Sequence, residues 1–134
     1  MGHVITEVPK SSEHFLGGIV SYSDAVKEEL LGVSPDLIGQ VGAVSAEVAE
    51  AMARGARERL GADLTIAITG VAGPGGGSEE KPVGLVYFHV ESPDGGRGSS
   101  FSFPGDRDSI RRRAVVASLH LARRLLTRNR DRVV

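Results

Sequence analysis

A glycine-rich stretch followed by a hydroxyl and a cation is the first candidate for chemistry in this sequence. Five glycines fall within eight residues: Gly70, Gly73, Gly75, Gly76 and Gly77. Because glycine has no side chain, the backbone N–H groups of such a stretch can converge on an anion. Ser78 adds a hydroxyl donor, and Lys81 adds a positive charge. No GK[ST] sequence and no new helix follow, so the stretch is neither a P-loop nor a dinucleotide fingerprint. It predicts a phosphate or sugar cradle, and the alternative is a long, flexible hairpin connection.

A tyrosine and a lysine form the second candidate. Tyr22 ends an apolar run, and Lys27 falls in the first turns of the helix expected next. Such a pair at the ligand-binding edge of a sheet could transfer protons, provided that burial lowers the pKa of the lysine. The alternative is a surface lysine on an amphipathic helix. The four histidines show no metal-ligand spacing, so we expect neither a metal nor a cofactor.

Apolar runs predict the strands that hold these residues. We expect buried strands over 15–23, 64–69 and 82–91, and a more exposed hairpin partner over 99–103. The glycine stretch then leaves the carboxyl end of a central strand, which is where ligands bind in open α/β sheets. Pro74 and Pro82 flank most of the stretch and stiffen it.

Capping residues and apolar periodicity predict the helices. Four polar side chains can each begin a helix: Ser23, Ser34, Ser45 and Asp106. Gly32 and Gly61 follow the ends of two of these helices. The alternation of strands and helices predicts an α/β fold, a three-layer α/β/α sandwich with a mixed sheet.

Composition restricts the class of protein. The chain has 134 residues, no cysteine and a formal net charge of −1, which is typical of one domain without disulfides or zinc clusters. No apolar run reaches the roughly 20 residues that span a bilayer, and we expect a cytoplasmic protein without membrane contact. Residues 106–134 hold nine arginines against three acids, so a nucleic-acid or acidic partner is conceivable, although a solvated helix face is the usual explanation.

Four segments together resemble a known family. FLGGIVSYSDAVKEELLGV, GAVSAEVAEAMARGA, ITGVAGPGGGSEEKPVGLVYF and FPGDRDSIRRRAV follow in the order and spacing of the CinA carboxy-terminal domain family. That family comprises nicotinamide mononucleotide amidohydrolases (NMN deamidases, or PncC) and competence/damage-inducible proteins. The resemblance covers residues 4 to about 127 and implies one CinA C-terminal-like domain over residues 1–134.

The resemblance implies an activity and a site. The activity is hydrolysis of the carboxamide of nicotinamide mononucleotide to nicotinate mononucleotide and ammonia, without a metal, in pyridine nucleotide recycling. Tyr22 and Lys27 match the family's catalytic tyrosine and lysine, and the glycine stretch matches its nucleotide-binding loop. The residues expected to bind substrate are Gly70, Ala72, Gly73, Pro74, Gly75, Gly76, Gly77, Ser78, Lys81 and Arg107.

One family motif is not matched. Family members begin with a strand, an ESCTGG motif and a helix, and the serine of that motif is the nucleophile. Here VITEVPKSS looks like the tail of that helix, which implies a domain shortened at its amino end by about 25 to 35 residues. The remaining candidate serines, none in a matching motif, are Ser11, Ser12, Ser21, Ser23 and Ser78. A sheet without that strand has unpaired edges, so we expect a homo-oligomer.

Three functions therefore remain open from the sequence. The chain is an amidohydrolase, a nucleotide-binding or regulatory module without catalysis, or a competence-related partner of nucleic acid through its arginine-rich helix. An upstream ESCTGG supports the first, binding without turnover the second, and strongly salt-dependent DNA binding the third.

Overall fold

A three-stranded antiparallel sheet lies at the centre of the protein, whose computed structural model describes residues 1–130. The strands are β1 (Thr65–Gly70), β2 (Leu85–Ser92) and β3 (Gly95–Ser102), in the order β1-β2-β3. Thr65 lies opposite Glu91, and Leu85 lies opposite Ser102. The expected mixed sheet is therefore wrong, because each described strand runs antiparallel to its neighbour.

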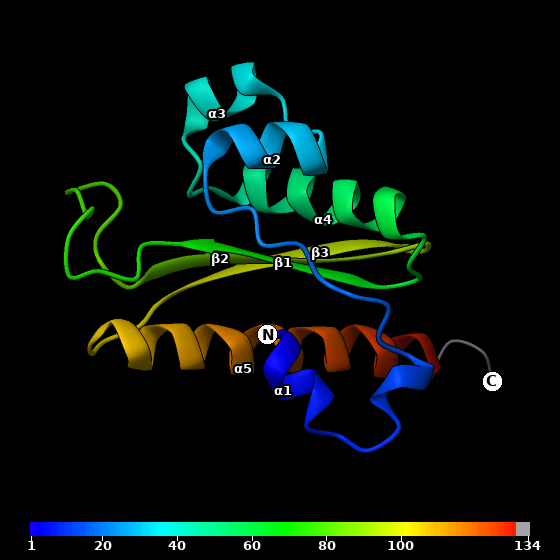
Figure 1. Ribbon diagram of the computed structural model, residues 1–134. Coiled ribbons are helices and arrows are strands. Elements are labelled where there is room, and N and C mark those ends of the chain that lie inside the picture. Colours follow the sequence, from blue (N-terminus) through cyan, green and yellow to red (C-terminus); the bar gives the residue numbers. More distant parts are fainter. Residues whose placement is uncertain (131–134) are drawn as a thin grey trace.

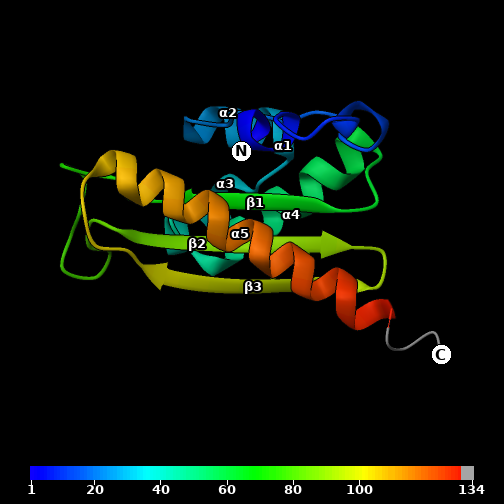
Figure 2. The same cartoon turned by 90° about the horizontal axis from the view of Figure 1, so that it is seen from below.

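Helices cover both faces of the sheet (Figure 1). On one face lies α4 (Ala46–Leu60), with α2 (Asp24–Leu31) and α3 (Pro35–Val41) outside it. The other face carries the long helix α5 (Arg107–Arg130), which crosses the strands obliquely in Figure 2. The short helix α1 (Gly2–Thr6) and a 3-10 turn (Ser11–Glu13) lie on the α5 side of the sheet. The three-layer arrangement is thus as expected.

Each face of the sheet has its own apolar core. Leu31, Val33, Val48, Met52 and Ala67 pack between α2, α4 and β1. The second core has Val86, Phe88, Ile110 and Ala114 between β2 and α5. The residues of β2 alternate between these faces, as the period of two in a strand requires. No helix of residues 1–130 is long and apolar enough to cross a membrane.

The predicted helix caps are confirmed. The side chains of Ser23, Ser34 and Ser45 accept hydrogen bonds from the backbone N–H three residues later, at 3.3, 3.4 and 3.2 Å. Asp106 accepts from the N–H of Ser109 at 2.8 Å at the start of α5. Hydrogen bonds from the Ser109 backbone and side chain, aided by the nearby Arg112 charge, hold the pKa of Asp106 below its ordinary value.

The strand expected over 15–23 is wrong. These residues are extended, and their side chains alternate between half-buried and exposed, but they pair with no strand in the described part of the chain. Val20 and Tyr22 are 87% and 83% exposed. An apolar extended segment becomes a strand only when another strand supplies backbone partners, which a residue pattern does not reveal.

Candidate functional site

The candidate site lies at the carboxyl end of β1. The glycine-rich connection between β1 and β2 projects from this end of the sheet, where α2, α4 and α5 also begin (Figure 1). The positive ends of three helix dipoles therefore face the same side of the molecule as the connection. These partial charges are offset in part, because Asp24, Glu47 and Asp108 lie in the first turns of the three helices.

Hydrogen bonds order the glycine-rich connection at its base and near its tip. At the base, the N–H of Val71 donates to the carbonyl of Leu85 at 2.9 Å, and the N–H of Gly84 donates to the carbonyl of Val71 at 2.7 Å. Nearer the tip, the N–H of Ser78 donates to the carbonyl of Lys81 at 2.9 Å, and the Ser78 hydroxyl accepts from the N–H of Lys81 at 3.0 Å. These bonds fix the base of the connection and a turn over residues 78–81.

The glycines of this connection differ in what surrounds them. A Cβ on Gly73 would lie 2.5 Å from a methyl carbon of Val83, and one on Gly77 would lie 2.9 Å from the Val83 backbone nitrogen. A Cβ on Gly75 or Gly76 would meet no atom within 4 Å. Gly73 and Gly77 are therefore required for packing on Val83. Gly75 and Gly76 instead leave exposed backbone that a ligand could approach.

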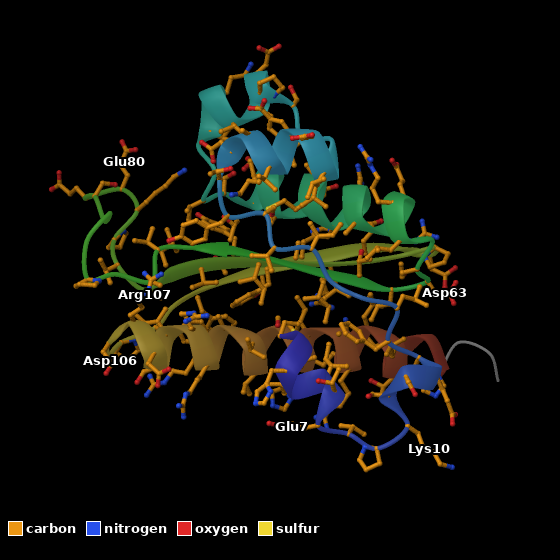
Figure 3. The ribbon with its side chains drawn as sticks, in the orientation of Figure 1. Glu7, Lys10, Asp63, Glu80, Asp106 and Arg107 are labelled. Atoms are coloured by element: carbon orange, nitrogen blue, oxygen red, sulfur yellow. The ribbon has the colours of Figure 1, made fainter. Side chains whose placement is uncertain are left out.

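Lys81 and Arg107 fasten the connection to the body of the domain. The Lys81 ammonium donates to the carbonyl of Val41, the last residue of α3. Arg107, at the start of α5, donates to the carbonyl of Gly73 at 2.8 Å. Figure 3 shows Arg107 between the connection and α5, with Glu80 at the outer part of the connection. Lys81 thus reaches from the connection to α3, and Arg107 reaches from α5 to the connection, each by a bond to a main-chain carbonyl.

Lys27 is buried at the start of α2. Only 6% of the residue is exposed, and its ammonium donates to the carbonyls of Ser21 and Tyr22 at 2.9 and 3.2 Å. Asp24 Oδ1 lies 3.9 Å from the ammonium, but the Asp24 side chain is 57% exposed. The alternative of a surface lysine is therefore wrong. A buried ammonium held mainly by main-chain carbonyls is a costly arrangement, which is typical of functional sites.

The tyrosine and serine candidates are less closely engaged. The Tyr22 side chain is 83% exposed, and its hydroxyl has no hydrogen-bond partner within residues 1–130. The hydroxyls of Ser23 and Ser78 accept backbone N–H bonds in the helix cap and in the turn. In the described residues, no serine hydroxyl forms a hydrogen bond with the Lys27 ammonium, which bonds to carbonyls instead.

The loop between α3 and α4 is a further wall of the site that sequence reasoning did not assign. Thr69, near the end of β1, donates to the carbonyl of Ala43 at 2.8 Å, and Ser45 donates to the carbonyl of Gly42 at 2.9 Å. With the Lys81 contact to Val41, these bonds fasten this loop beside the glycine-rich connection. A threonine near the end of a mainly apolar strand was the available signal.

The fold and site define an α/β domain with a glycine-rich connection and a buried lysine at one end of its sheet. Residues 1–126 match the family model described as the CinA C-terminal domain. The chain belongs to the CinA C-terminal domain family.

Named relatives agree with this assignment. A CinA-like protein of Mycolicibacterium paratuberculosis is 53% identical over 128 residues, and one of Prochlorococcus marinus is 52% identical over 128 residues. These matches cover 92% and 94% of this chain, which spans only 30% of the length of either relative.

Solved structures show the same fold. The competence/damage inducible protein CihA from Agrobacterium tumefaciens has a TM-score of 0.90 and 36% identity. A CinA superfamily protein from Escherichia coli has a TM-score of 0.88 and 32% identity. The alignments cover 92% of this chain in both cases, and 76% and 72% of those chains.

Proposed function

We propose that this site binds nicotinamide mononucleotide and belongs to an amidohydrolase that converts its carboxamide to the carboxylate, with release of ammonia. The observation that carries the proposal is the burial of Lys27 at the end of the sheet where the glycine-rich connection projects. A buried amine beside an anion-favouring loop suits the hydrolysis of an amide attached to a phosphorylated group.

The roles follow from the chemistry of each group. Exposed backbone N–H groups near Gly75 and Gly76 hold the phosphate, with Lys81 and Arg107 beside them. The Lys27 amine accepts the proton of an attacking hydroxyl and later passes a proton to the departing ammonia. The Tyr22 hydroxyl donates a hydrogen bond at the reacting amide. The hydroxyl oxygen bonds to the amide carbon as the C–N bond breaks and ammonia leaves. One water then cleaves the resulting ester, which gives the carboxylate its second oxygen and returns a proton to the hydroxyl.

The attacking hydroxyl is the open part of this mechanism. The family resemblance gives this role to the ESCTGG serine, and the 134 residues contain no match to that motif. Removing a serine nucleophile abolishes most of the rate acceleration of such enzymes. We therefore expect the 134-residue chain to bind the nucleotide without turnover, and a version that includes an upstream ESCTGG segment to release ammonia.

A second candidate is a nucleotide-binding or competence/damage-related module without catalysis. The observation that favours it is the contact of the Lys27 ammonium with two carbonyls and no hydroxyl. The exposed Tyr22 side chain points to the same conclusion. Binding by the glycine-rich connection does not depend on either residue, so a regulatory function would keep the anion site alone.

Calorimetry and ammonia release separate these candidates. Lys27→Met removes the amine, whereas Lys10→Met removes an exposed lysine as a matched control. In the version with the upstream segment, Lys27→Met should abolish ammonia release and Lys10→Met should not. Nucleotide binding without ammonia from that version identifies the non-catalytic module. Absence of nucleotide binding contradicts both candidates.

The stability of the Lys27→Met variant shows whether its loss of activity is direct. The substitution leaves no buried countercharge, because Asp24 is exposed, and the freed carbonyls belong to a half-buried and an exposed residue that water can reach. We therefore expect a change below about 1.5 kcal/mol, the net contribution of one ordinary hydrogen bond. A loss of about 3 to 5 kcal/mol would give Lys27 a structural role.

Lys81→Ala tests the anion site separately. Lys81 belongs to the connection and ties it to α3, so its loss should weaken phosphate-dependent binding of nicotinamide mononucleotide in calorimetry. Equal affinity of the variant and the unmodified protein would remove Lys81 from the site.

A further inference from the structure

The outer edge of β3 is an unprotected sheet edge. β3 pairs with β2 on one side and with no other strand of residues 1–130 on its second side. Its residues are nearly all exposed, three of the first four are glycine, and Arg97 is its only charged residue. Natural edge strands are usually shielded by charges, proline or a covering segment. The N–H and C=O groups of this edge are therefore available to another strand.

A groove runs beside this edge, between β3 and the C-terminal half of α5. It has a volume of about 430 Å³, and its sheet side is formed by Phe88, Ser99 and Phe101. Phe101 is 53% exposed and stacks on Phe103 with ring centroids 5.6 Å apart. The groove is thus apolar along its sheet side, with an exposed aromatic ring next to the open edge. In Figure 2 the C-terminal half of α5 passes in front of β3.

The helix side of the groove is basic. His120, Arg123 and Arg124 line it, with Leu121 between them. Both arginines are exposed, and neither forms an ion pair with another side chain in the described part of the chain. By contrast, Arg112 in the first turns of the same helix pairs with Asp108 at 3.0 Å. Two unpaired guanidinium groups beside an apolar surface favour an occupant with both carboxylates and apolar side chains.

We propose that this groove docks an extended acidic segment of a partner protein, which adds a strand to the outer edge of β3. Main-chain hydrogen bonds to β3 supply affinity, as in other cases of strand addition. Alternate side chains of the segment face α5, because successive residues of a strand point to opposite faces. Apolar side chains contact Phe101 and Leu121, and carboxylates reach Arg123 and Arg124. This role is separate from the proposed nucleotide site at the end of β1.

Charge disfavours a second copy of this chain as the occupant. Two β3 edges paired antiparallel across a two-fold axis would place both α5 helices on one face of the joined sheet. The arginines of the two grooves would then face each other, and close like charges oppose association. Nucleic acid is also disfavoured, because it lacks a backbone that can pair with a strand edge.

A designed peptide tests the proposal with the protein as it exists. The probe is a fluorescein-labelled, end-capped peptide, Asp-Thr-Leu-Thr-Leu-Thr-Asp, in which Asp and Leu share one face. Fluorescence anisotropy should show saturable binding, with a dissociation constant on the order of 100 µM, because one short strand supplies few contacts. Hydrogen exchange of residues 95–102 should slow when the peptide is bound, since added backbone hydrogen bonds protect the amides.

Matched variants locate the contacts. Arg123→Gln/Arg124→Gln should weaken binding about fivefold to tenfold, as expected for two exposed charge pairs. Arg111→Gln/Arg112→Gln removes the same charge from the other end of α5 and should leave the affinity unchanged. Phe101→Thr, which keeps a strand-forming residue, should weaken binding about threefold to tenfold through the lost apolar contact. The same peptide with Asn in place of Asp should bind less tightly.

Several results would overturn the proposal. One is the absence of saturable binding at millimolar peptide, and another is equal weakening by the two arginine pairs. Binding of an oligothymidylate that is lost in Arg123→Gln/Arg124→Gln would make the groove a nucleic-acid site. Self-association that protects residues 95–102 and is lost in Phe101→Thr would make a second copy the occupant.

Discussion

Gly75→Ala separates a ligand-binding role of the glycine-rich connection from a folding role. A Cβ at this position meets no atom within 4 Å, and the backbone is not in the left-handed region. The folded state can therefore accept alanine without strain. Alanine also lowers the conformational entropy of the unfolded chain, so the free energy of unfolding should stay constant or rise by about 0.4 to 1 kcal/mol.

Nucleotide binding should respond in the opposite direction. The new methyl group would occupy the open space through which a phosphate approaches the backbone N–H groups of Gly75 and Gly76. Loss of one hydrogen bond to a charged phosphate costs about 1.5 to 3 kcal/mol. This corresponds to a dissociation constant about tenfold to a hundredfold higher. A variant that is at least as stable but binds weakly cannot owe its defect to unfolding.

Calorimetric titration with nicotinamide mononucleotide and a thermal melt of the same samples measure both quantities. Gly39→Ala is the matched control, because Gly39 lies in α3 and a Cβ there also meets no atom within 4 Å. It should stabilise the protein without changing affinity. Gly77→Ala should lower both stability and affinity, since its methyl would press on Val83. Unchanged affinity in Gly75→Ala would refute the cradle.

Three other predictions concern packing, pH and assembly. Gly84→Ala should lower the free energy of unfolding by about 3 kcal/mol or more in denaturant titration. The reason is that a Cβ would lie 2.1 Å from the Phe103 carbonyl oxygen, and that φ of Gly84 is +97°. A neutral effect would contradict this packing. Asp106→Ala should lower the Tm at neutral pH. Because the folded-state pKa of Asp106 is depressed, the carboxylate stabilises the fold at pH values above its unfolded pKa. The Tm difference between the two proteins should therefore fade as the pH drops below about 4. A constant Tm difference down to pH 2 would contradict this role of Asp106. We expect the 134-residue chain to self-associate, because β1 pairs only with β2 among the described residues; a cooperatively melting monomer in sedimentation equilibrium would contradict this.

Local signals sufficed for the helices and failed where a strand needed a distant partner. A serine or aspartate followed by an apolar period fixes a helix start within a few residues, which is why the caps at Ser23, Ser34, Ser45 and Asp106 were predictable. The segment over 15–23 has the apolar alternation of a strand, but strand pairing depends on residues elsewhere. The antiparallel pairing of β2 with β3 was predicted as a hairpin, whereas the antiparallel pairing of β1 with β2 was not.

The polar interior of β2 could not be predicted for a similar reason. His89 and Glu91 are both buried, and His89 Nε2 lies 2.9 Å from Glu91 Oε2. A Cβ on Gly96 of β3 would lie 2.2 Å from His89 Nε2, so the glycine provides the room for this pair. Arg54 of α4 approaches Glu91 at 3.7 Å from the helix layer. Burial of the Glu91 carboxylate in β2 therefore depends on residues of β2, β3 and α4 together.

The glycine-rich connection shows how far residue types can lead toward a site. Spacing alone placed Gly73, Gly75, Gly76 and Gly77 in one loop at the end of a strand, and that placement is correct. Spacing could not show which of these glycines are needed for packing and which are open to a ligand. That distinction depends on Val83, which packs on Gly73 and Gly77 and leaves Gly75 and Gly76 free. A glycine required for packing is essential whether or not a ligand binds. Only a substitution at a glycine with open surroundings can reveal whether a ligand binds there. Gly75 has no left-handed backbone, so its substitution by alanine tests ligand binding without disturbing the fold.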